Sequence, residues 1–266
     1  MRKRLKPGAT LEFRFPDLPP TLWARTHRRR RAARMLVCLP RDYRPDRQFP
    51  MVVFLGGGDG AAGTRADADY VRKVVGNRGF IGVSLPLFKK DLDRTEKYGG
   101  ILLSAFDDYP LIARCYRRML GELLAAVPNI APGAGAIGGF SNGGHTTALL
   151  LSAVDPFILK HFRSFFLLDG GFFIASLHKS VIGRKRILHL VGGSRRKAWR
   201  RWLLAFLDGA CGAARKAGRD VTLLKMPNVE HAFPDEYIGA LRKWLRQGTG
   251  GGRRRVAASE EVSRGR

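Results

Sequence analysis

Short apolar runs alternate along this chain with longer segments whose apolar residues recur at helical spacing, which predicts strands alternating with helices. The predicted strands are Thr10–Phe15, Arg34–Leu39, Met51–Leu55, Phe80–Leu85, Ala134–Gly138, Ser164–Leu168, Arg186–Val191 and Val221–Met226. The predicted helices are Asp67–Val75, Tyr109–Val127, Gly144–Leu151, Ala198–Ala217 and Asp235 to about Gln247. This alternation predicts an α/β protein with a mainly parallel central sheet and helices on both faces.

One domain accounts for this pattern. We expect it to cover residues 1–247, with the strands in the region 10–39 included. The segment 86–107 mixes charges with glycine and has no clear period, so it is interpreted as a loop or a small lid. The end of the chain, 248–266, is rich in Gly and Arg and then polar, which predicts a disordered tail.

The charge of the chain is strongly basic, with a formal net charge of +26 over 266 residues. Such a charge attracts polyanions. The excess is spread over separate clusters, chiefly Arg25–Arg34, Arg195–Arg201 and Arg253–Arg255, and no nucleic-acid-binding motif accompanies it. We therefore interpret it as a solvated basic surface and expect no specific nucleic-acid function.

Cofactors, metals and membranes leave no signature in the sequence. The three cysteines, Cys38, Cys115 and Cys211, are too far apart for a disulfide framework or a metal motif, so we expect buried, reduced thiols. The loop 56–61 lacks the spacing of a dinucleotide-binding loop, and no carboxylate cluster suggests a metal. No secretory signal or run of membrane-spanning length is visible, which favours a cytoplasmic protein. The sequence does not define the oligomeric state.

The most informative motif is Gly139-Phe140-Ser141-Asn142-Gly143, which lies between a predicted strand and a predicted helix. A serine on such a sharp turn holds its hydroxyl clear of the backbone. The flanking glycines permit unusual backbone angles and close approach of neighbouring chains. The first N–H groups of the helix point into the space beside the serine, where an oxyanion could lie.

This order of elements resembles the α/β-hydrolase superfamily, and within it the group that includes esterase D-like and feruloyl-esterase-like enzymes. The similarity extends from about Arg34 to Leu245. It is carried by three passages: Leu36–Tyr43 with Phe49–Leu55, Gly138–Gly144, and Asn228–Pro234. The resemblance implies a nucleophile, an acid and a histidine in that chain order, and it implies hydrolysis of a small-molecule ester without a cofactor.

Within this resemblance Ser141 is the expected nucleophile and His231 the expected base, because His231 follows the last strand at the same edge of the sheet. The alternative for His231 is a loop histidine bonded to backbone. His145 is a rival base, but the serine helix carries it away from the hydroxyl. His189 lies inside a strand and is interpreted as a core residue. No context supports a role for the remaining histidines, His27, His161 and His178.

The acid is harder to assign. In the resembling family it usually follows the strand that here ends at Val191, but the residues 192–197 contain no carboxylate. Asp169 ends the preceding strand at the same edge and is the preferred candidate for orienting the imidazole. The alternative is that Asp169 only caps a turn, with Asp208 and Asp235 as less favoured acids.

The expected oxyanion site has two backbone donors. Asn142 supplies the first, and Gly57 or Gly58, in the glycine loop after an early strand, supplies the second. Together these residues predict a serine esterase that forms an acyl-serine intermediate. The alternatives are a peptidase, thioesterase or acyltransferase using the same site, or a non-catalytic protein that binds an anionic partner.

Overall fold

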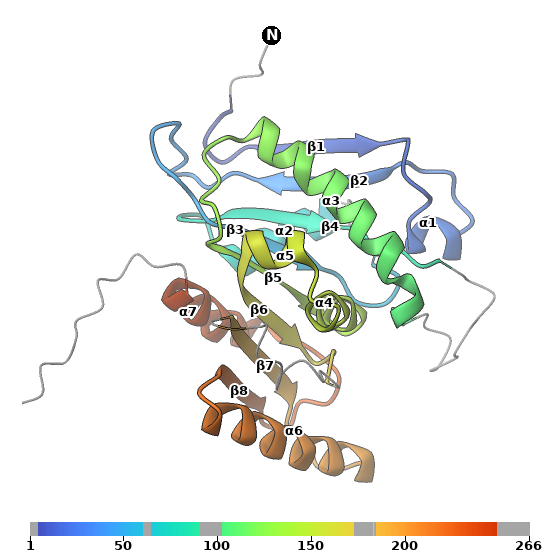
Figure 1. Cartoon of the computed structure of the whole chain (residues 1–266), viewed down its shortest axis with the longest axis vertical. Coiled ribbons are helices and arrows are strands. Elements are labelled where there is room, and N and C mark those ends of the chain that lie inside the picture. Colours follow the sequence, from blue (N-terminus) through green and yellow to red (C-terminus); the bar gives the residue numbers. More distant parts are fainter. Residues whose placement is uncertain (1–4, 61–64, 91–102, 173–182, 184, 249–266) are drawn as a thin grey trace, which may run out of the picture.

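A computed structural model describes residues 5–60, 65–90, 103–172, 183 and 185–248. Its centre is an eight-stranded sheet in the order β1-β2-β4-β3-β5-β6-β7-β8 (Figure 1). The pairs β1–β2 and β2–β4 are antiparallel, and every other neighbouring pair is parallel. The strands are β1 (Thr10–Phe15), β2 (Ala33–Cys38), β3 (Met51–Leu55), β4 (Ile81–Leu85), β5 (Gly135–Phe140), β6 (Phe162–Leu168), β7 (Arg186–Gly192) and β8 (Asp220–Met226). The prediction of a mainly parallel sheet is confirmed.

Helices cover both faces of this sheet. Figure 1 shows α3, α4 and α5 in front of the strands, with α2 and α7 behind them. The helices are α1 (Leu22–Thr26), α2 (Arg65–Val75), α3 (Tyr109–Ala126), α4 (Asn142–Ser152), α5 (Pro156–His161), α6 (Ala198–Lys216) and α7 (Ile238–Gly248), with short 3-10 helices η1 (Phe106–Asp108) and η4 (Asp235–Tyr237). Central strands β3 and β4 are buried along their whole length, as expected for strands covered on both sides.

Two short helices escaped the sequence prediction. Helix α1 lies between the first two predicted strands, where no helix was predicted, and α5 follows the serine helix. Each is capped locally: the Thr21 side chain accepts from the Ala24 N–H, and Asp155 accepts from the Ile158 N–H. Elements of five and six residues are too short to display a hydrophobic period, so capping residues were their only available signal.

The parallel strands carry the loops that matter for function. Because β3, β5, β6, β7 and β8 run in the same direction, their carboxyl ends meet at one edge of the sheet. Residues that directly follow these strands, such as Ser141 after β5 and Asp169 after β6, therefore lie near one another although they are distant in sequence.

Two sequence predictions fall largely outside the described residues. Of the predicted tail 248–266, only Gly248 is described, and it is the last residue of α7 rather than part of a tail. Residues 249–266 lie outside the described part, and so do residues 91–102 of the segment interpreted as a lid. The described ends of that segment are held by buried Asp108, which accepts from the Lys89 ammonium at 3.0 Å and the Lys90 N–H at 2.7 Å. In the part of the chain that is described, no helix has both the length and the apolar character needed to cross a membrane.

Candidate active site

Ser141 occupies a strained turn between β5 and α4. Its backbone angles are φ 52° and ψ −114°, a combination that residues other than glycine rarely adopt. The turn is tight because the strand and the helix meet against the end of β3. A Cβ atom added at Gly139 or Gly143 would lie 2.4 or 2.2 Å from the Leu55 carbonyl oxygen, so only glycine fits at either position. The local sequence therefore dictates the turn that presents the hydroxyl.

The Ser141 hydroxyl, the His231 imidazole and the Asp169 carboxylate form one hydrogen-bonded chain. Ser141 Oγ lies 2.9 Å from His231 Nε2, and His231 Nδ1 lies 2.5 Å from Asp169 Oδ2. Because an ionised carboxylate only accepts hydrogen bonds, Nδ1 carries the proton that it donates to Asp169. In the neutral ring, Nε2 is then left as the acceptor for the serine hydroxyl. Three segments that are 28 to 90 residues apart in sequence meet here.

The Asp169 side chain is fully buried, and its carboxylate accepts hydrogen bonds from three residues. Besides His231, its carboxylate accepts from the Gly192 N–H at 2.9 Å and from both terminal nitrogens of Arg200, at 2.7 and 3.2 Å. Burial alone would raise the pKa of Asp169, but the hydrogen bonds from His231, Arg200 and Gly192 outweigh it and hold the pKa below its ordinary value. The carboxylate is therefore ionised at neutral pH.

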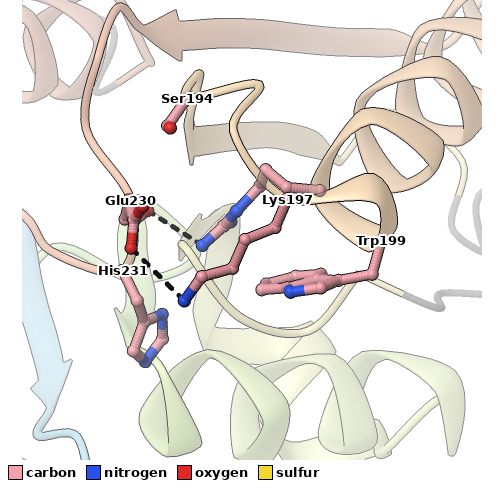
Figure 2. Close-up of a pocket in the computed structure, with 6 residues that line it drawn as sticks. Ser194, Lys197, Trp199, Glu230 and His231 are labelled. Atoms are coloured by element: carbon pink, nitrogen blue, oxygen red, sulfur yellow. Dashed lines mark hydrogen bonds and ion pairs between the residues drawn. The ribbon is translucent and has the colours of Figure 1, made fainter.

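The His231 ring is held by stacking as well as by hydrogen bonds. It lies over Phe140, with ring centroids 5.1 Å apart and an interplanar angle of 28°, and half of its side chain is exposed. A small pocket opens beside it, and Figure 2 shows Trp199 across this pocket from His231, with Lys197 reaching toward Glu230. The imidazole is thus fixed in orientation but open to solvent and to a substrate.

The glycine loop after β3 lies against the serine. A Cβ atom added at Gly57 would lie 3.3 Å from Ser141 Cβ and 2.9 Å from a ring carbon of Phe140. Next to it, the Asn142 side chain donates to the Gly58 carbonyl at 2.8 Å and accepts from the Ser104 N–H at 2.9 Å. Gly57 and Asn142, two of the three residues expected to supply oxyanion donors, are therefore neighbours of Ser141, and Asn142 connects Gly58 to the segment before η1.

The other candidate acids lie elsewhere. Asp208 pairs with Lys225 at 2.6 Å, and Asp235 pairs with Lys73 at 3.0 Å, so neither carboxylate contacts His231. His145 does not bond the serine hydroxyl; its backbone N–H donates to the Ser141 carbonyl. The His145 ring packs edge-on against Phe172, and burial, with the nearby His231, lowers its pKa.

Sequence reasoning missed two residues of this site, Phe140 and Arg200. The interpretation of the run Arg195–Arg201 as solvated surface is wrong for Arg200, whose side chain is only 3% exposed. A signal was present, because Arg200 begins the buried stripe of α6. That stripe continues through Leu203, Leu204, Leu207, Cys211 and Ala214. A charged residue in an apolar stripe requires a buried partner.

Many solved structures resemble this chain, and three of them illustrate the likeness. A fungal esterase structure from Rhizomucor miehei matches with a TM-score of 0.57 and 13% identity over 92% of this chain and 85% of that chain. TT1662 from Thermus thermophilus matches with a TM-score of 0.58 and 13% identity, over 92% of this chain and 99% of that chain. Esterase 2 of Thermogutta terrifontis, phosphonylated by cyclosarin, matches with a TM-score of 0.58 and 15% identity, over 84% of this chain and 92% of that chain. No protein-family model and no curated protein matches the sequence.

At these identities the likeness defines the fold, and this chain has the α/β-hydrolase fold that its sequence predicts. A hydroxyl, an imidazole and a buried carboxylate in this order can activate a serine for attack on a carbonyl carbon. Within the described residues, no group of three His, Cys, Asp or Glu side chains is placed to hold a metal ion.

Proposed function

We propose that this protein is a serine hydrolase that cleaves carboxylic esters through an acyl-serine intermediate. The observation that carries the proposal is the continuous hydrogen-bonded chain from Ser141 Oγ through His231 to Asp169. A serine hydroxyl is a weak nucleophile at neutral pH and needs a base at its oxygen. His231 Nε2 is within hydrogen-bonding distance of that oxygen, and Asp169 holds the ring in the required tautomer.

In the proposed reaction, Ser141 Oγ attacks the ester carbonyl carbon while its proton passes to His231 Nε2. The carbonyl oxygen becomes an oxyanion, stabilised by the backbone N–H of Asn142 and that of Gly57 or Gly58; one such donor contributes about 3 kcal/mol. The intermediate collapses as His231 protonates the leaving alcohol. Water, activated by the same histidine, then releases the carboxylic acid and restores the serine.

The structural neighbours support this choice of reaction. Two of them are named as esterases, and one of these is phosphonylated by cyclosarin. The likeness does not specify the acyl or alcohol group. Peptidases, thioesterases and acyltransferases would share the same acyl-enzyme chemistry, and substrate profiling separates them. The non-catalytic alternative rested on the missing acid after β7, and with Asp169 bonded to His231 that observation no longer favours it.

The proposal is tested by replacing the nucleophile. Ser141→Ala should abolish hydrolysis of p-nitrophenyl acetate and butyrate and also labelling by a fluorophosphonate probe. Ser164→Ala is the matched control, because the buried Ser164 hydroxyl has no hydrogen-bond partner among the described residues and lies on β6. It should retain both activities. Full hydrolysis by Ser141→Ala, or equal labelling of both variants, would reject the assignment.

A further inference from the structure

Arg200 is a buried cation that the proposed reaction does not itself require. It lies in the first turn of α6, and its guanidinium makes three hydrogen bonds. Two go to the two carboxylate oxygens of Asp169, and the third goes to the Glu230 carbonyl at 2.9 Å. Trp199 covers the guanidinium, with its ring centroid 4.5 Å from the central carbon. A buried arginine with this many fixed partners is a built feature of the site.

The two sets of partners belong to different segments of the site. Asp169 follows β6, whereas Glu230 directly precedes His231 in the loop after β8. One rigid, planar group therefore sets the rotation of the carboxylate and also the position of the backbone that carries the imidazole. A guanidinium fork suits this task because its donors have a fixed geometry, which a lysine ammonium lacks.

Arg200 also supplies the positive charge against which the buried Asp169 carboxylate lies. The other charged or titratable groups around the pair are His145 from α4, Lys197 near the start of α6, and Glu230, whose carboxylate pairs with Lys197 at 3.5 Å (Figure 2). Of these cations, only Arg200 contacts the Asp169 carboxylate.

We propose that Arg200 is a positioning residue for the ester hydrolysis inferred above, which aligns Asp169 with the loop that carries His231. The inference rests on the proposed function. The inference also explains how an acid that follows β6 is held in position for His231. Arg200, in the first turn of α6, supplies the counter-charge that holds the Asp169 carboxylate in place.

The test compares Arg200→Met and Arg200→Lys with Arg201→Met. Arg201 is the matched control because it is exposed and its guanidinium donates to the backbone carbonyls of Arg195 and Arg196, away from Asp169. We expect Arg200→Met to lower kcat about 100-fold with little change in KM, because a misplacement of about 1 Å has such an effect. Arg200→Lys, which keeps the positive charge but not the planar fork, should lose less kcat than Arg200→Met. Arg201→Met should behave as the wild type.

A readout that does not depend on activity separates this inference from the proposed function. The short His231 Nδ1–H···Asp169 bond should give a far-downfield proton NMR signal that disappears in His231→Gln. The signal should broaden or shift in Arg200→Met and persist in Arg201→Met. Circular dichroism checks that each variant is folded. If Arg200→Met does not fold, Arg200→Lys takes its place in the comparison. An unchanged kcat together with an unchanged signal in a folded Arg200 variant would overturn the inference. Inactivity of the wild type with a normal signal would instead overturn the proposed function.

Discussion

Two histidines of this chain, His231 and His189, differ in their location in the fold, their exposure and their hydrogen bonding. His231 lies in the loop after β8 with half of its side chain exposed, and both ring nitrogens have partners. His189 lies in the middle of β7 and is 1% exposed, and neither of its nitrogens has a hydrogen-bond partner in the described part of the structure.

Their surroundings explain the contrast. In the sheet register His189 is flanked by Leu167 on β6 and Leu223 on β8, so its ring occupies an apolar position. Burial lowers its pKa to about 4, and the ring is neutral at physiological pH. His231 instead lies against the ionised Asp169 carboxylate, which accepts a hydrogen bond from Nδ1 and fixes the orientation of the ring. Location at a strand end, with a carboxylate on one nitrogen, is what equips a histidine for proton transfer.

The largest expected effect comes from removing the active-site histidine. His231→Gln should lower kcat for p-nitrophenyl esters by at least about 10⁴-fold, because no base then accepts the Ser141 proton. The melting temperature should change little, since the side chain is half exposed. Steady-state kinetics and thermal denaturation measure the two quantities. A near-normal kcat would show that another group is the base and that His231, like His189, has no role in proton transfer.

Asp169→Asn should lower kcat about 10⁴-fold, because an amide at that position no longer fixes the tautomer of His231. It also leaves the buried Arg200 charge without its counter-ion, so the free energy of unfolding should fall by about 3 kcal/mol. Asp208→Asn is the matched control, since that carboxylate pairs with Lys225 away from His231. Kinetics and urea unfolding test both parts. An active Asp169→Asn enzyme would reduce Asp169 to a structural residue.

The core histidine should affect stability and its pH dependence. An unfolded histidine titrates near 6.5, whereas folded His189 resists protonation down to about 4. The unfolded state therefore binds more protons between these values, and stability falls as the pH falls through this window, by roughly 3 kcal/mol in total. His189→Leu removes this loss while keeping catalysis. Urea unfolding at several pH values should show the variant gaining on the wild type from pH 6.5 to 4; parallel curves would contradict the burial argument.

The fold and much of the site could be predicted from the sequence because both depend on local patterns. The buried runs mark β3 and β6, and the glycines around Ser141 mark a turn that only they permit. The edge rule for parallel strands then places Asp169 and His231 near the serine. These steps need only the order of elements along the chain.

What the sequence could not provide were partners chosen by packing across distant segments. Asp169 and Arg200 are 31 residues apart, and no local pattern identifies one as the partner of the other. The contact exists because Arg200, in the first turn of α6, reaches the residue that follows β6. Phe140 likewise gains its role only when the loop after β8 places His231 over it. Such pairs are set by tertiary geometry, although the position of Arg200 at the start of the apolar stripe of α6 was a usable signal.

The smallest effect is expected at a third histidine, which lies between the two extremes. His145 is close to the site, yet its ring contacts Phe172 edge-on and makes no bond to the Ser141 hydroxyl. His145→Phe keeps an aromatic ring in that contact and removes both ring nitrogens, so kcat/KM should change by less than about threefold. The backbone bond from residue 145 to the Ser141 carbonyl remains available in the variant. A loss approaching that of His231→Gln would show that proximity to the serine, and not a carboxylate partner, determines which histidine transfers the proton.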